Sequence, residues 1–137
     1  MDNPDVPARL ALVVGRLNRR LRGAGGGLSH GLLSALATVS KDGPMRLAEL
    51  AQIEQVSAPS TTRLVAELEA QGLVSRRPDP IDGRAVLISA TPQGSDTVTR
   101  ARSARGAMVQ ELFEQLSADD IAAIEAALPA LERTLEA

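Results

Sequence analysis

Residues 79–84, with the sequence DPIDGR, place two carboxylates, a proline, a glycine and an arginine in one short segment. Gly83 can adopt the positive φ that a tight turn often requires, and Arg84 follows it directly. The Asp82 carboxylate, two residues earlier, can hold the guanidinium in a fixed orientation. A guanidinium at a loop tip can enter a narrow electronegative groove, such as the minor groove of DNA. The alternative is a polar surface turn with a weak ion pair, worth about 0–1 kcal/mol.

A second group of polar residues opens a predicted helix over residues 58–71. Ser57 is suited to the N-cap, and Pro59 is tolerated in the first turn. The face expected to pack on a core holds Thr61, Leu64, Val65 and Leu68. The opposite face holds Ser60, Thr62, Arg63 and Glu67. Free N–H groups and short hydroxyls at a helix N-terminus can contact phosphates and base edges. The alternative is a capped helix whose hydroxyls face water.

Hydrophobic periodicity predicts the elements that carry these two segments. Apolar residues three and four apart indicate helices over residues 8–22, 30–41, 47–54, 58–71, 92–116 and from 118 onward. Two short β-branched segments, 73–77 and 85–90, indicate strands on either side of the DPIDG loop. The order of helix, short helix, helix and hairpin over residues 30–91 predicts a winged helix-turn-helix. We therefore expect a mainly α fold with a small β-hairpin.

The flanking helices carry apolar stripes that one small domain cannot bury. We expect residues 1–29 to form an N-terminal dimerisation helix with a glycine-rich joint. Residues 30–91 would form the winged domain, and residues 92–137 C-terminal dimerisation helices. Pairing with a second copy would bury the stripes, which predicts a homodimer. The residues expected in this interface are Leu10, Val14, Leu17, Leu21, Leu112, Phe113, Leu116, Ile121, Ile124, Leu128, Leu131 and Leu135.

Charge and composition restrict the classes of function. The net charge is −2, but residues 106–137 carry −6, which leaves +4 for residues 1–105. Contact with a polyanion is therefore expected from residues 1–105. The absence of cysteine excludes disulfides, a thiol redox switch and a cysteine-ligated zinc site. No apolar run approaches the roughly 18 residues that span a bilayer, and the N-terminus lacks a signal-peptide h-region, so we expect a cytoplasmic protein.

Residues 47–94 resemble the MarR family of bacterial transcriptional regulators. The matching segments are LAELA, TTRLVAELEAQGLVSR and DPIDGRAVLISATPQG, in this order. The helical pattern extends the resemblance over nearly the whole chain. The resemblance implies a homodimer that binds a pseudo-palindromic operator on double-stranded DNA and commonly represses nearby genes.

The resemblance also implies roles for particular residues. The helix over 58–71 would enter the major groove, with groove and phosphate contacts from Ser57, Pro59, Ser60, Thr62 and Arg63. Arg84 would reach the minor groove, with Asp82 as its orienting partner. Arg76 and Arg77, on the strand that leads into the wing, would contact phosphates.

Such regulators often release DNA when a small, frequently aromatic or phenolic, ligand binds between the dimerisation and DNA-binding regions. This chain has no Tyr or Trp and one Phe, Phe113, so a pocket would be lined by aliphatic and arginine side chains, and the effector stays open. His30, the single histidine, could belong to such a pocket or sense pH, although a structural or solvated role is more common. Pro129 lies inside the last predicted helix and cannot donate a backbone hydrogen bond, so we expect a kink or break there.

Two other classes of function remain as alternatives. Residues 57–84 hold four arginines against four acids, so the winged helix could be a protein-interaction module without specific DNA binding. Asp79 and Asp82 could be imagined as an acid/base pair or a metal site. No His, Cys or Glu accompanies them, however, and their spacing does not fit a calcium loop. We therefore expect no enzymatic activity, no cofactor and no metal.

Overall fold

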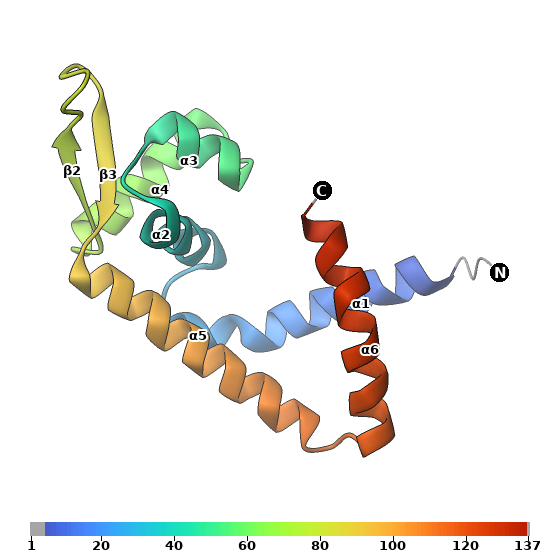
Figure 1. Ribbon diagram of the computed structural model, residues 1–137. Coiled ribbons are helices and arrows are strands. Elements are labelled where there is room, and N and C mark those ends of the chain that lie inside the picture. Colours follow the sequence, from blue (N-terminus) through green and yellow to red (C-terminus); the bar gives the residue numbers. More distant parts are fainter. Residues whose placement is uncertain (1–4, 137) are drawn as a thin grey trace. The chain divides into compact units, whose positions relative to one another are not determined.

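The computed structural model describes residues 5–136 (Figure 1). By its internal contacts the chain divides into two units, Met1–Arg105 and Gly106–Ala137. Helix α5 (Pro92–Phe113) spans this division, and it ends three residues before the predicted position 116. The first unit contains every element of the predicted winged helix-turn-helix.

The predicted winged helix-turn-helix fold is confirmed. It consists of α2 (His30–Asp42), α3 (Leu47–Glu54), α4 (Ala58–Ala70), β2 (Val74–Pro78) and β3 (Val86–Ala90). The predicted hairpin is antiparallel, with Val74 opposite Ala90 and Pro78 opposite Val86. The sequence did not predict a further strand, β1 (Met45–Arg46), which pairs with β3 and gives a three-stranded sheet in the order β1-β3-β2. At two residues, β1 is too short to show any alternation.

The core of the winged domain lies between the three helices and the sheet. Leu36 of α2, Leu50 of α3, Leu68 of α4 and Ile88 of β3 are each 0% exposed. Full burial of an aliphatic side chain contributes about 1.5–3 kcal/mol. Thr61 is also buried, and its hydroxyl donates to the Ser57 carbonyl oxygen at 2.9 Å. The predicted inner face of α4 is therefore the face that packs on the core.

A glycine allows α5 to begin in direct contact with the base of the wing. A Cβ at Gly94 would lie 2.0 Å from the Leu73 carbonyl oxygen and 3.2 Å from Leu36 Cδ1. Thr91 closes the same junction, since its hydroxyl donates to the Gly72 carbonyl oxygen at 2.7 Å and accepts from the Gly94 N–H at 3.0 Å. The first turn of α5 is thus fixed to the hairpin.

The flanking helices are α1 (Asp5–Leu21) and α6 (Ala118–Leu135). The predicted glycine-rich joint carries a turn of 3-10 helix, η1 (Arg22–Gly25), rather than plain linker. Of the kink or break expected at Pro129, the break is absent, because α6 runs through Pro129 as one helix. Pro129 and Glu125 are exposed, so water can bind the Glu125 carbonyl that the missing N–H leaves free. No described residue of α1 or α6 is buried.

Candidate nucleic-acid interface

The N-terminus of α4 presents a connected set of polar side chains. Ser57 is the N-cap, and its hydroxyl oxygen accepts from the Ser60 N–H at 3.3 Å. The Ser57 hydroxyl also donates to Ser60 Oγ at 2.9 Å. Arg63 Nη2 donates to the same Ser60 oxygen at 3.1 Å. Pro59, Thr62 and Arg63 are exposed, so the guanidinium is held on the outer face of α4 beside free helix N–H groups.

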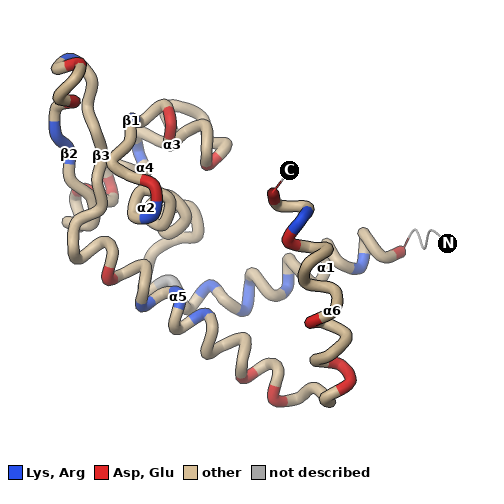
Figure 2. Tube along the Cα trace, viewed as in Figure 1, with Lys and Arg blue, Asp and Glu red and all other residues tan. Residues whose placement is uncertain are grey.

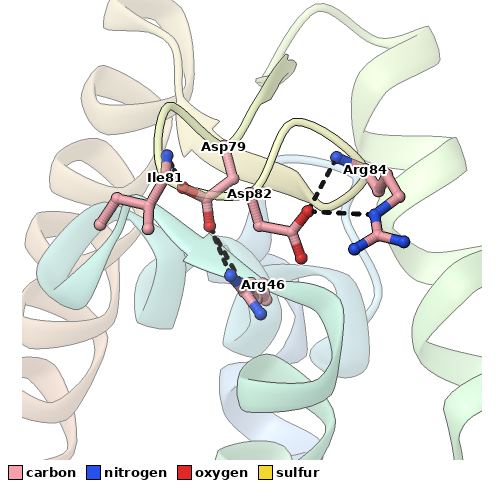
Figure 3. A network of polar contacts seen from close by, with 5 residues as sticks. All are labelled: Arg46, Asp79, Ile81, Asp82 and Arg84. Carbon is pink, nitrogen blue, oxygen red and sulfur yellow. Dashed lines mark hydrogen bonds and ion pairs between the residues drawn. The ribbon is translucent and has the colours of Figure 1, made fainter.

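The wing tip presents Arg84 almost free of the rest of the protein. Its side chain is 96% exposed, and its Nε lies 3.6 Å from Asp82 Oδ1. The same carboxylate oxygen accepts from the Arg84 backbone N–H at 3.1 Å (Figure 3). The predicted ion pair with Asp82 is therefore present. At this separation it is a loose pair rather than a hydrogen bond between the side chains.

Asp79, at the base of the same loop, is a buried structural carboxylate. Its Oδ2 accepts from Arg46 Nη2 at 2.6 Å and from Arg46 Nε at 3.2 Å, and its Oδ1 accepts from the Ile81 N–H at 2.9 Å (Figure 3). The hydrogen bond from Ile81 and then the Arg46 guanidinium hold the pKa of Asp79 below its ordinary value. Asp79 in turn raises the pKa of Arg46. Both oxygens are engaged by protein donors, so Asp79 is not arranged as an acid/base group.

Arg76 and Arg77 lie on β2 and differ in their surroundings. Arg76 Nε donates to Glu69 Oε2 at 2.7 Å, and the two side chains are 33% and 45% exposed. Arg77 is an exposed residue opposite Leu87 of β3. Of the two predicted phosphate contacts, Arg77 is thus the more accessible to a phosphate. Arg76 also forms an ion pair with the C-terminal end of α4.

None of the twelve residues predicted for dimerisation is buried in the single chain, and seven of them are exposed. Leu10, Val14 and Leu17 of α1 are 38%, 50% and 40% exposed. Further exposed positions on α6 are Ile121, Leu128, Leu131 and Leu135. The partly buried members of the predicted set are Leu21, Leu112, Phe113, Leu116 and Ile124.

The charges are segregated as the sequence indicates. Basic residues follow α1 and the first half of α5, and acidic residues dominate the end of α5 and α6 (Figure 2). On α5, Arg100 is paired with Asp96 at 3.1 Å. Within the first unit, the excess of positive charge therefore lies on α1 and the first half of α5 rather than on the winged domain.

A cavity of about 520 Å³ lies beside the N-terminus of α2. His30, whose role the sequence left open, lines it together with Arg22, Asn18 and Arg105. Its apolar wall is formed by Leu21, Leu28 and Leu33. The cavity thus combines an apolar wall with two arginine residues in its lining, which suits a small organic anion.

Two further features of the chain bear on other classes of function. Within residues 5–136, no three His, Asp or Glu side chains lie close enough together to hold a metal ion. No helix in this described part is both long and apolar enough to cross a membrane.

Comparison with known proteins identifies relatives of this chain. The model of the MarR family matches residues 28–86. An uncharacterized HTH-type transcriptional regulator of Mycobacterium bovis is 42% identical over 119 residues, which cover 82% of this chain and 83% of that protein.

Two solved structures share the fold. The structure of RV1404 from Mycobacterium tuberculosis has a TM-score of 0.85 at 24% identity, and the match covers 98% of this chain and 95% of that chain. A mutant of MepR from S. aureus, bound to an oligodeoxyribonucleotide, has a TM-score of 0.70 at 20% identity, with 95% and 97% covered.

Proposed function

The chain belongs to the MarR family of HTH-type transcriptional regulators, and we propose that it is a homodimeric repressor that binds a pseudo-palindromic operator. In each subunit α4 would enter the major groove while the wing reaches the adjacent minor groove. The proposal depends mainly on one observation: the same unit exposes two groups suited to contact DNA. The first is the hydrogen-bonded pair Ser60–Arg63 on α4, and the second is the almost fully exposed side chain of Arg84.

The proposed contacts divide into three groups. Ser57, Pro59, Ser60, Thr62 and Arg63 would contact base edges and phosphates of the major groove. Arg84 would occupy the minor groove, with Asp82 orienting it. Arg77 would contact phosphate directly, and Arg76 would do so while paired with Glu69.

We assign dimerisation to the apolar stripes of α1 and α6. Several apolar side chains on each helix are more than a third exposed in the single chain, a state that association with a second copy would relieve. The charges favour the same partner, because residues 1–105 carry +4 and residues 106–137 carry −6. The basic first unit of one copy and the acidic second unit of its partner are complementary.

The cavity beside His30 is the proposed site of a regulatory ligand. Arg22 and Arg105 would bind a carboxylate, and the leucine wall would hold an apolar body. A panel of aryl carboxylates and their uncharged amides tests this proposal by thermal shift. Stabilisation by the acids that is lost in Arg105→Met supports it, and equal effects of acids and amides contradict it.

Selection of binding sites from random duplex DNA tests the operator. We expect a palindromic site whose affinity falls steeply with salt, because several phosphate contacts per subunit release counterions. Transcription from a promoter that overlaps the selected site should fall when the protein is added. No enriched site at low salt would favour the alternative of a winged-helix protein-interaction module, for which salt dependence is shallow.

A further inference from the structure

The loop that carries Arg84 is closed by hydrogen bonds within the hairpin. The Asp79 N–H donates to the Ala85 carbonyl oxygen at 2.9 Å, and the Ala85 N–H donates to the Asp82 carbonyl oxygen at 2.9 Å. The Asp79 carboxylate accepts from the Ile81 N–H at 2.9 Å. These bonds fix the shape of the loop, but they do not fix its position relative to α4.

Arg46 connects this loop to the helix-turn-helix. It is the last residue of β1, and Leu47, which follows it, begins α3. Helix α3 packs against α4. The Arg46 guanidinium holds Asp79 through two hydrogen bonds to one carboxylate oxygen, and the Asp79 side chain is only 8% exposed (Figure 3). A short path therefore runs from the recognition helix through α3 and Arg46 to the base of the wing loop.

We propose that Arg46 is a positioning residue for DNA binding: through Asp79 it sets the place of Arg84 relative to α4. The inference rests on the proposed operator binding, in which α4 and the wing must enter neighbouring grooves at the same time. A wing held in place before binding avoids the entropy of ordering it on DNA. Loss of Arg46 would leave the buried carboxylate uncompensated and the loop free to move.

A competing role for Arg46 is direct contact with a phosphate, since its side chain is 44% exposed. The two roles differ in their relation to Arg84. A positioning residue acts through Arg84, so its removal has little effect once Arg84 is gone. A phosphate contact acts independently, so the two losses add.

The test is a cycle of four proteins bound to the selected operator at several salt concentrations. We call the Arg46–Asp79 ion pair the brace. The four proteins are the wild type, Arg84→Ala, a variant without the brace (Arg46→Met with Asp79→Asn) and the combination of all three substitutions. The brace is removed without a change of net charge, and the amide oxygen introduced by Asp79→Asn can still accept from the Ile81 N–H. We expect Arg84→Ala to weaken binding about tenfold or more. The variant without the brace should lose most of the operator affinity that Arg84→Ala loses. The combination should bind no more weakly than Arg84→Ala.

The control is Arg100→Met with Asp96→Asn, which removes an exposed ion pair of α5 without a change of net charge. It should bind the operator as the wild type does.

Faster amide exchange at Ile81 and Ala85 in the variant without the brace would show that the loop is released. If that variant binds the operator with wild-type affinity, the positioning role of Arg46 is wrong, and the proposal of operator binding is unaffected. Additive losses, with a salt slope reduced by about one further phosphate per subunit, assign Arg46 to direct contact. A wild type that selects no DNA site removes both proposals.

Discussion

Asp82 binds the backbone of Arg84 more closely than it binds the Arg84 side chain. Its Oδ1 accepts from the Arg84 N–H at 3.1 Å, whereas the guanidinium Nε lies 3.6 Å away. The carboxylate therefore fixes where the arginine side chain begins, and leaves the 96% exposed guanidinium free to exchange Asp82 for a new partner. This arrangement suits an arginine that must reach outward to bind.

Replacement of Arg84 by alanine should weaken operator binding by about 1–3 kcal/mol per subunit and reduce the salt dependence. The side chain is almost fully exposed, so the melting temperature should stay close to that of the wild type. Fluorescence anisotropy and thermal unfolding measure the two effects. Arg84→Lys is the matched control, which keeps the charge and should retain part of the affinity. A large fall in melting temperature would instead make Arg84 a structural residue.

Gly94→Ala should destabilise the winged domain by about 3 kcal/mol or more, because the new Cβ would lie 2.0 Å from a backbone oxygen. Gly106→Ala, in the same helix, is its control, since nothing lies within 4 Å of a Cβ built there. That substitution should stabilise the chain by about 0.5–1 kcal/mol through helix propensity. Urea unfolding of both variants checks the pair, and equal effects would contradict the packing of α5 on the wing.

Leu128→Asp should abolish the dimer and, with it, operator binding. Leu128 is 44% exposed in the single chain, so the substitution spares the fold and places one charge per subunit in the proposed interface. Arg133→Asp puts the same residue on α6 away from the apolar stripe, and should remain dimeric. Sedimentation velocity measures both. A Leu128→Asp protein that still sediments as a dimer would place the interface elsewhere.

The stabilisation from Asp79 should depend on pH in the acid range. Its pKa is lower in the folded protein than in the unfolded chain, so its contribution is fully present above the unfolded value of about 4. The contribution is lost as pH falls below that value and through the folded pKa. The free energy of unfolding of the wild type should therefore exceed that of Asp79→Asn by a constant amount from pH 7 to about 5. Below about pH 4 the difference should shrink. A difference independent of pH would show that neither the Ile81 N–H nor the Arg46 guanidinium lowers the pKa of Asp79.

Much of the fold could be predicted from short-range patterns. The caps at Ser57 and Ser117 each satisfy N–H groups within three residues, so the residue types alone indicate where α4 and α6 begin. Helical periodicity likewise assigned Val65 and Leu68 to the core. The DPIDGR loop was recognisable, and so was the Asp82–Arg84 pair, because its partners are two residues apart.

Other features depend on partners that are far apart in the chain. Arg46 and Asp79 are separated by 33 positions, and they meet because the two-residue strand β1 pairs with β3, which no local pattern indicates. The same holds for Gly94, whose role comes from the Leu73 carbonyl beside it. The sequence by itself determined the helices, the two strands of the hairpin and their order, since backbone hydrogen bonds and side-chain periodicity act over a few residues. The tertiary structure decided that the Asp79 carboxylate is buried beside Arg46, because a charge leaves water only where a distant segment supplies its counter-charge.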